Sequence, residues 1–373
     1  MTYLDYNSTA HVRPEAIDAV TEALISQGNA SSVHALGRQA RTRIEAARAK
    51  VAALAGCLPS SVTFLSGGVE ANALAIESAV LAGFGRLIIS ATEHVSVLET
   101  ARLSGVPVMM WPVDGDGLAD LTWLENTLAQ GPRALVCLML ANNETGVIQP
   151  VAKVSALVRA AEGWLHVDAV QAAGKITIGF SALGADTLSL SAHKIGGPQG
   201  VGALVAGPRA TLTRRIHGGA QEGGRRSGTE NGPGIAGFGA AADAALRDLT
   251  KVQAQSVWRD AFAVRAVTIG AVILGGDAPR LAQTLCLALP GYSADVQVMA
   301  MDLAQIMVSA GSACSSGKVK PSHVVEAMGH SNIALNSIRI SGGWDTTEED
   351  WHRAADVWLG LAARHLTRQT QAA

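Results

Sequence analysis

Long hydrophobic runs, paired cysteine motifs and an excess of charge of either sign are all missing from this sequence. The four cysteines show no CxxC spacing, which disfavours a zinc site and a disulfide framework. No apolar run reaches the length of a membrane span, and the first residues carry Asp5 and no apolar signal core, so we expect a cytoplasmic protein. The net charge of −2 argues against a surface for polyanions or membranes, which leaves small molecules as the expected substrates.

The chain has the length and composition to bury a large core. It contains 373 residues, 48% of them hydrophobic, and its mean hydropathy is +0.23, which favours two packed domains. Short apolar runs alternate with helical stretches from the helix ending at Gly56 to the run TLSLS at 187–191, and this alternation predicts a parallel α/β sheet of six or seven strands. From about Ala240 a long helix, short apolar runs and a final helix from near Thr347 predict a smaller α+β part.

The segment 189–204, SLSAHKIGGPQGVGAL, contains the most informative residue, Lys194. A lysine between a strand and a glycine-rich turn is suited to a covalent bond with an aldehyde such as that of pyridoxal phosphate (PLP). Ser191 and His193 then offer donors to the phosphate of PLP. A solvated lysine after a strand is the alternative, and the forced turn at Gly196 and Gly197 disfavours it.

Other polar residues follow predicted strands, where open parallel sheets bind ligands. Asp168 is placed to hold the pyridine nitrogen of PLP, and Gln171 to donate to its ring hydroxyl, although a lone aspartate there is more often a helix cap. His94 is a candidate to lie on the ring and move protons, or to cap a helix. Gly67 and Gly68 suit a phosphate at a helix N-terminus, or geometry alone.

Two further segments carry candidate residues. In RRSGTENGPG, Arg226 and Thr229 are placed to reach a phosphate or a subunit boundary, and the glycines make this segment a loop in either case. Cys314 lies in the Gly/Ser-rich segment SAGSACSSGK, which predicts an exposed, reactive thiol, whereas the other three cysteines have apolar or helical surroundings.

In order along the chain, the segments YLDYNSTA, SGGVEANALA, TEHVSVLE, NNETGVIQP, HVDAVQ, SAHKIGGPQGVGAL, RRSGTENGPGIAGFG, SAGSACSSG and IRISGGWDTTEED resemble the cysteine desulfurases of the nitrogen-fixation and iron–sulfur-cluster type. These enzymes are class V aminotransferases of PLP fold type I. The resemblance implies a large domain at 13–245 with a mainly parallel seven-stranded sheet between helices. It implies a small α+β domain formed by 1–12 and 246–373.

The resemblance also implies an activity: a homodimer that converts L-cysteine to L-alanine, leaves a persulfide on the enzyme and passes sulfur to an acceptor or an iron–sulfur scaffold protein. No intrinsic metal is implied, although Cys314 is placed to ligate a cluster transiently with a scaffold partner. The implied site residues are Lys194 and Cys314 as catalytic residues, His94 as ring-stacking acid/base, Asp168 and Gln171 on the PLP ring, Gly68, Val69, Ser191, His193 and the neighbouring subunit's Thr229 on its phosphate, and Asn143 and Arg339 on the substrate carboxylate.

Departures from the family pattern leave other functions open. Val69 stands where threonine is usual, Ala30 replaces a proline, and Trp344 stands where arginine is typical; the region from Lys251 to Arg280 is also short. The alternatives are another class V PLP enzyme such as a selenocysteine lyase, or a low-activity paralogue that relays sulfur or binds a scaffold. Neither nitrogen fixation, general iron–sulfur assembly nor tRNA thiolation is singled out as the destination of the sulfur.

Overall fold

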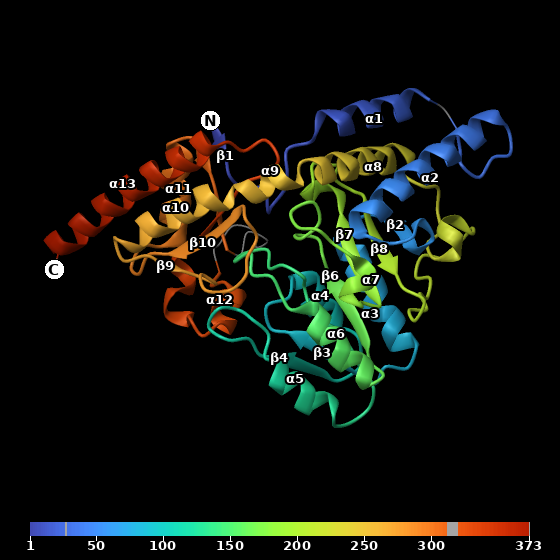
Figure 1. Ribbon diagram of the computed structural model, residues 1–373, viewed down its shortest axis with the longest axis horizontal. Coiled ribbons are helices and arrows are strands. Elements are labelled where there is room, and N and C mark those ends of the chain that lie inside the picture. The colour runs from blue at the N-terminus through green and yellow to red at the C-terminus, as the bar shows by residue number, and fades with distance from the viewer. Residues whose placement is uncertain (27, 312–319, 373) are drawn as a thin grey trace.

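A seven-stranded sheet forms the centre of the larger part of the molecule, as the computed structural model of residues 1–26, 28–311 and 320–372 shows (Figure 1). The strands lie in the order β2-β8-β7-β6-β5-β3-β4. Their bounds are β2 (Val62–Leu65), β3 (Arg86–Ser90), β4 (Val108–Trp111), β5 (Ala134–Cys137), β6 (Trp164–Asp168), β7 (Thr187–Ser191) and β8 (Gly202–Ala206). Only β8 runs antiparallel to its neighbours β2 and β7. The predicted mainly parallel α/β sheet is therefore confirmed.

The seventh strand, β8, has no counterpart among the apolar runs from which strands were predicted. It follows β7 after a turn through Gly196 and Gly200, both of which have positive φ values that favour glycine. A short turn of this kind returns the chain beside the strand it has just left, which gives an antiparallel pair rather than a helical crossover.

Helices cover the sheet on both faces, as expected for a sheet whose strands are buried on both sides (Figure 1). In this part they are α1 (Pro14–Ile25), α2 (Ala35–Ala55), α3 (Gly68–Leu81), α4 (Val95–Arg102), α5 (Leu121–Leu128), α6 (Val151–Ala160), α7 (Phe180–Leu183) and α8 (Gly232–Arg247). The predicted end of α2 at Gly56 is confirmed, since Gly56 caps the helix in the left-handed conformation with φ 63°.

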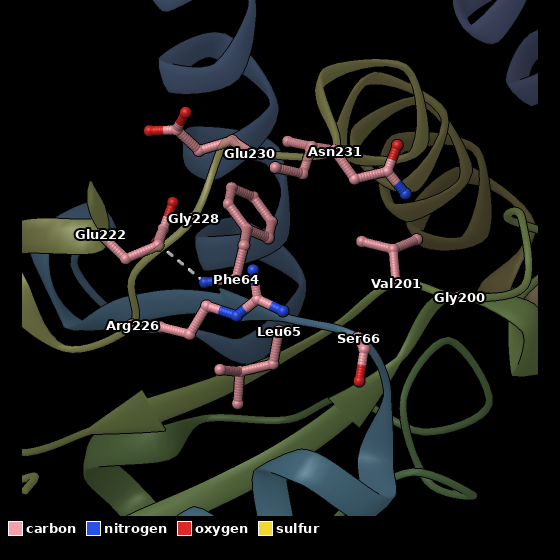
Figure 2. A pocket seen from close by; sticks show the side chains of 11 residues that line it. Phe64, Leu65, Ser66, Gly200, Val201, Glu222, Arg226, Gly228, Glu230 and Asn231 are labelled. Atoms are coloured by element: carbon pink, nitrogen blue, oxygen red, sulfur yellow. Dashed lines mark hydrogen bonds between the residues drawn. The ribbon is translucent and has the colours of Figure 1, made fainter. Parts of the chain in front are cut away.

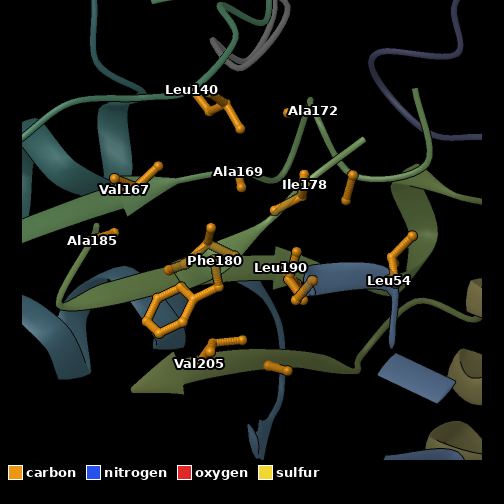
Figure 3. Close-up of a cluster of buried hydrophobic side chains, with 14 of the residues drawn as sticks. Leu54, Leu140, Val167, Ala169, Ala172, Ile178, Phe180, Ala185, Leu190 and Val205 are labelled. Atoms are coloured by element: carbon orange, nitrogen blue, oxygen red, sulfur yellow. The ribbon is translucent and has the colours of Figure 1, made fainter. Parts of the chain in front are cut away.

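The main core lies between the sheet and the helices on one face. Figure 3 shows Leu190 of β7 and Val205 of β8 gathered with Leu54 of α2 and Phe180 of α7. Small residues let the covering helices pack closely, since a Cβ atom on Gly239 of α8 would come within 2.6 Å of the α2 backbone. This layer fixes the position of β6 and β7, which carry the candidate PLP residues at their ends.

The C-terminal part has its own sheet and core. Its four-stranded antiparallel sheet has the order β12-β13-β10-β9, and side chains such as Phe262, Trp351 and Trp358 form a separate buried cluster. Its elements are α9 (Leu249–Ala254), α10 (Ser256–Val267), β9 (Val272–Ile273), β10 (Thr284–Ala288), α11 (Ala294–Leu303), β11 (Ile306–Met307), β12 (Ser309–Ala310), α12 (His323–Ala327), β13 (Ser337–Ser341) and α13 (Glu348–Ala372). The predicted α+β character is confirmed, and the long helix expected from Ala240 is divided into α8, α9 and α10.

The N-terminal segment connects the two parts. Its strand β1 (Thr2–Tyr3) pairs in parallel with β11, and the amide of Tyr6 donates to Ser341 in β13. Farther along, the amide of Ala10 donates to the backbone oxygen of His193, just after β7. Residues 4–13 therefore cross from the small sheet to the carboxyl edge of the large sheet. Within the described ranges, the helices include none with the length and hydropathy needed to cross a bilayer.

Candidate functional site

The predicted PLP residues gather at the carboxyl edge of the large sheet. Asp168 is the last residue of β6, Lys194 ends the short 3₁₀ helix after β7, and His94 follows β3 as the N-cap of α4. His94 is close enough to Asp168 and Lys194 for both charges to act on its imidazole. The parallel arrangement of these strands explains why residues a hundred positions apart share one site.

Lys194 is held by the N-terminal segment. Its Nζ donates to the backbone oxygens of Asn7 and Ser8, at 2.6 Å in each case. Gln171 Nε2 donates to the same Asn7 oxygen, at 2.8 Å. Lys194 and Gln171 therefore donate to the same atom. Their side chains are close enough together for one PLP ring to contact both.

Asp168 is buried and fixed through both of its carboxylate oxygens. Asn72 Nδ2 of α3 donates to Oδ2 at 2.8 Å, and the backbone amide of Val170 donates to Oδ1 at 2.9 Å. Each carboxylate oxygen can accept more than one hydrogen bond, so the group still has capacity for a protonated ring nitrogen. The Asp168 side chain thus fits the predicted role and does not depend on a helix cap for its position.

A buried chain of hydrogen bonds leads to Asp168. Trp164 Nε1 donates to Thr187 Oγ1 at 3.1 Å, and Thr187 Oγ1 lies 2.9 Å from His166 Nδ1. His166 Nε2 lies 3.0 Å from Asn72 Oδ1. Because the tryptophan nitrogen can only donate and Asn72 Oδ1 can only accept, every proton in the chain has a defined direction, ending with the donation from Asn72 to Asp168. Burial lowers the pKa of His166 to about 4, with Asp168 acting in the opposite direction, so its ring is neutral.

His94 caps a helix, which is one of the two interpretations that its sequence position left open. Its Nδ1 accepts from the backbone amide of Ser96 at 3.2 Å and lies 2.8 Å from the Ser96 hydroxyl, so it does cap α4. Ser96 Oγ in turn accepts from Asn72 Nδ2 at 2.9 Å. A ring that accepts at Nδ1 carries its proton at Nε2 when neutral. Burial lowers the pKa of His94, and Lys194 lowers it further, whereas Asp168 raises it.

The candidate phosphate site lies at the N-terminus of α3. Gly68 begins this helix, and a Cβ atom on it would come within 2.9 Å of Val170 and 3.8 Å of the Ser191 side chain. A Cβ atom on Gly67 would meet nothing within 4 Å, so open space remains beside the free helical amides. The residues present therefore fit an anionic group. Val69 is 61% exposed in the first turn and offers no hydroxyl to it.

The other predicted phosphate residues lie in different surroundings. His193 Nδ1 is 3.2 Å from Thr9 Oγ1, and burial, followed by the charges of Lys194 and Lys175, lowers the pKa of His193 to about 4. Thr229 is exposed in the loop before α8, so its expected reach to a neighbouring subunit's phosphate stays a prediction. Arg226 of the same loop is paired with Glu70 in the first turn of α3, at 3.3 Å.

A pocket with about 400 Å³ of empty space opens between this loop and the end of β2 (Figure 2). Arg226 and Gly228 line it from the loop, and Ser66 lines it from the turn that leads into Gly67 and Gly68. The loop is anchored nearby because Glu222 accepts from the backbone amide of Phe64 at 2.8 Å. The pocket therefore adjoins the helix N-terminus proposed for the phosphate.

Arg339 and Asn143, predicted to bind the substrate carboxylate, are in contact. Arg339 Nη1 donates to the Asn143 backbone oxygen at 2.9 Å, and Nη2 donates to Ser8 Oγ and to Asp5 Oδ1, both at 2.7 Å. The ion pair with Asp5 was not expected from the sequence. Arg339 Nε is buried and has no hydrogen-bond partner among the described residues, so one donor of the guanidinium is open.

Cys314 lies outside the described residues, but both ends of segment 312–319 are held near the site. Before it, Gly311 lies against Glu144, since a Cβ atom there would come within 2.5 Å of the Glu144 carboxylate. After it, Ser322 Oγ donates to Glu144 Oε2 at 2.5 Å, and His323 Nε2 lies 3.0 Å from the backbone oxygen of Glu93. Among the described residues, no group of three His, Cys, Asp or Glu side chains is arranged to hold a metal ion.

Comparison with known proteins decides the family. Residues 2–353 match the aminotransferase class-V family. The chain belongs to this family. It is 42% identical over 367 residues to a cysteine desulfurase of Cereibacter sphaeroides, with 95% of this chain and 94% of that protein covered. The family is PLP-dependent, in agreement with the predicted cofactor.

Solved structures give the same result for the fold. A NifS-like protein from Rickettsia africae superposes with a TM-score of 0.87 at 33% identity, covering 96% of this chain and 98% of that one. SspA in complex with cysteine superposes with a TM-score of 0.79 at 29% identity, covering 91% and 98%. The predicted PLP fold type I is therefore confirmed.

Several residues that build the site were not identified from the sequence. Asn72 orients Asp168 from α3, His166 supports Asn72, and Asn7 binds both Lys194 and Gln171. Lys175 is buried beside Gln171. Spacing offers a signal for two of them: Asn72 comes four residues after Gly68 on the same helical face, and Lys175 comes four residues after Gln171.

The neutral buried ring of His166 predicts a loss of stability in acid. Its pKa is about 4 in the folded protein and about 6.5 when unfolded, so the unfolded chain binds more protons between these values and the free energy of unfolding falls as the pH drops through this window. The contribution is about 2 kcal/mol at pH 5 relative to pH 7. His166→Gln should reduce the difference between urea midpoints of the PLP-free protein at pH 7 and pH 5. His352→Gln, on the exposed face of α13, is the control; an unchanged pH dependence in His166→Gln would contradict the assignment.

Proposed function

We propose that this protein is a PLP-dependent cysteine desulfurase that converts L-cysteine to L-alanine and leaves the sulfur on Cys314 as a persulfide. The observation that carries the proposal is the convergence of Lys194, Gln171 and Arg339 on the Asn7–Ser8 backbone and side chains. This arrangement supports a covalent PLP site beside a carboxylate site. The 42% identity to a cysteine desulfurase supports the same activity.

The side chains at the carboxyl edge of the sheet would hold PLP. Lys194 would bind its aldehyde, Asp168 would hold its pyridine nitrogen, Gln171 would donate to its hydroxyl, and His94 would be the acid/base beside its ring. The residues assigned to its phosphate are Gly68, Val69, Ser191 and His193, with Thr229 of a second subunit. When bound, PLP supplies an electron sink for carbon chemistry at the substrate's Cα.

The substrate is held by its carboxylate. The planar guanidinium of Arg339 suits two parallel hydrogen bonds, and Asn143 lies against it. Asp5 already accepts from Nη2 and Nε is buried, so the incoming carboxylate would displace Asp5. The Lys194 amine would take the proton from the substrate's Cα.

Cys314 is the residue that receives sulfur in the proposed reaction. Its thiolate attacks the sulfur of the substrate, an S–S bond forms, and the bond between Cβ and sulfur breaks with its electron pair remaining on the carbon skeleton. The skeleton takes up a proton at Cβ, regains one at Cα from the Lys194 amine, and leaves as L-alanine. The persulfide then passes its outer sulfur to an acceptor.

The setting of the enzyme is also proposed. A homodimer would complete the phosphate site through Thr229, and a large domain at 13–245 would pack against a small domain formed by 1–12 and 246–373. The acceptor would be a sulfur carrier or an iron–sulfur scaffold protein in the cytoplasm, with Cys314 a transient ligand of a cluster. Nitrogenase assembly is one such destination.

The competing functions differ in measurable products. A selenocysteine lyase would release selenide from selenocysteine and little sulfide from cysteine, because its selectivity favours selenium. A low-activity paralogue would bind a scaffold without turnover. Cysteine-dependent sulfide release by the purified protein, compared with selenide release at equal substrate concentration, separates the three.

Alanine variants of Lys194 and Cys314 should stop the reaction at different steps. Cys314→Ala should keep the visible absorption of bound PLP, because Cys314 is not among the residues assigned to the cofactor, but it should form no protein persulfide and release alanine only at background. Lys194→Ala should lose the covalent PLP absorption before any substrate is added. Cys57→Ala is the matched control, since Cys57 follows α2 on the far side of the core. Parental sulfide release by Cys314→Ala would show that another group accepts the sulfur.

Arg339→Lys tests the carboxylate site. Lysine keeps the charge that pairs with Asp5 but loses the planar fork, whereas alanine would leave the Asp5 carboxylate without its cation. We expect the KM for cysteine to rise about ten- to hundredfold, the equivalent of one or two charged hydrogen bonds, with the PLP absorption unchanged. Loss of PLP from this variant at normal KM would assign Arg339 to the cofactor site instead.

Val69→Thr tests the departure in the phosphate site. A hydroxyl in the first turn of α3 would add one hydrogen bond to a charged phosphate, worth about 1.5–3 kcal/mol, so PLP should leave the variant more slowly during dialysis. Val257→Thr is matched, since Val257 is also the exposed second residue of a helix. Equal or faster loss of PLP from Val69→Thr would show that the local backbone has adapted to valine.

A further inference from the structure

Lys175 is a buried lysine that the proposed mechanism does not use. It lies in the turns that follow β6, and only 5% of it is exposed. Its Nζ donates to Gln171 Oε1 at 2.7 Å and to Asn7 Oδ1 at 3.2 Å. Both partners are amide oxygens. An amine taken out of water costs several kcal/mol unless its surroundings compensate, so its presence here calls for a specific role.

The contacts of Lys175 determine which way two amides point. The Asn7 backbone oxygen can only accept, so Gln171 Nε2 must face it, and the Gln171 oxygen then faces Lys175, whose Nζ donates to it. The same reasoning fixes Asn7, whose Oδ1 faces Lys175 and whose Nδ2 donates to Thr284 Oγ1 at 3.0 Å.

The orientation of the Gln171 amide matters because its oxygen accepts hydrogen bonds and its nitrogen donates them. With Nε2 on the Asn7 oxygen, the amide presents donors at the atom that Lys194 also contacts. A flipped amide would place an acceptor there, facing another acceptor. Lys175 and the Asn7 oxygen therefore define the orientation from opposite ends of the same amide.

We propose that Lys175 is a positioning residue of the PLP site, which holds Gln171 and Asn7 so that the Gln171 amide donates to the Asn7 backbone oxygen that Lys194 also contacts. The inference rests on the proposed PLP site and assigns Lys175 no contact with cofactor or substrate. Its effect passes through Gln171.

This role does not require a charge on Lys175. Burial lowers its pKa well below the ordinary value, and the charges of Lys194 and Arg339 lower it further. A neutral amine has two N–H groups, which equals the number of amide oxygens it faces. Methionine has nearly the same length and no donor, so Lys175→Met removes both hydrogen bonds while filling the same space.

A double-mutant cycle on the full-length PLP-bound protein tests the inference. The variants are Lys175→Met, Gln171→Met and the double variant, with Lys153→Met on exposed α6 as the control for loss of a lysine. The measurements are the rate of PLP loss during dialysis and the wavelength of the bound PLP absorption. Lys175→Met should lose PLP about five- to tenfold faster and shift the absorption, because Gln171 Oε1 is left without a donor. In the Gln171→Met background the same change should have little effect.

Equal effects of Lys175→Met in both backgrounds would overturn the inference and make Lys175 a structural residue. If Lys175→Met does not fold, Lys175→Leu, which also has no donor and is smaller, takes its place in the cycle; failure of both to fold would also overturn the inference. Sulfide release from cysteine is measured separately. PLP retention with no sulfide release would contradict the proposed activity and leave the cycle valid, whereas a parental protein that binds no PLP would overturn both.

Discussion

The backbone oxygen of Asn7 is the point on which the site depends. It accepts hydrogen bonds from Lys194 and Gln171, while the Asn7 side chain accepts from Lys175 and donates to Thr284 in the small sheet. The Asn7 amide also donates to Ser341 Oγ, at 3.0 Å. Four separate segments of the chain thus meet at one buried residue. The pairing of β1 with β11 holds the N-terminal segment in this place, so the position of the catalytic amine is set by contacts that cross between the two parts of the fold.

The directions of the hydrogen bonds allow only one orientation of the buried side chains at the carboxyl edge of the large sheet. The chain from Trp164 to Asp168 contains one tryptophan donor, one neutral histidine and one amide, and no member can be reversed without creating two facing acceptors or two facing donors. Asn72 has a second branch through Ser96 to His94. Asn72 therefore orients the Asp168 carboxylate, which is proposed to hold the ring nitrogen. Through Ser96 it also favours the His94 tautomer with its proton on Nε2. Buried networks of this kind are stable only when every member is satisfied.

Strand ends could be predicted from the sequence, and the contacts between them could not. Alternating apolar and helical segments indicated where β3, β6 and β7 end, and hence that His94, Asp168 and Lys194 share an edge. Nothing local connects Asn7 to Lys175 or Asp5 to Arg339, because these pairs lie 168 and 334 residues apart. Trp344, which departs from the family pattern, is held by two contacts. Its Nε1 donates to the His11 backbone oxygen, and the Arg13 guanidinium lies over its ring. The glycine before it is required, since a Cβ atom on Gly343 would overlap Tyr6.

The balance of charge around the site suits anionic ligands. Lys194 and Arg339 bring cationic groups to the junction of the two sheets, whereas burial favours the uncharged forms of the carboxyl groups nearby. Burial raises the pKa of Glu93 well above its usual range, and Asp168 raises it further. Burial likewise raises the pKa of Glu144, although Ser322, His323 and Arg339 act against it. After segment 312–319, Ser322 donates to the Glu144 carboxyl group and His323 contacts the backbone oxygen of Glu93. Because the raised pKa of Glu93 and Glu144 favours their uncharged forms, the positive charge of Arg339 and Lys194 is less opposed at the place proposed for a phosphate and a substrate carboxylate.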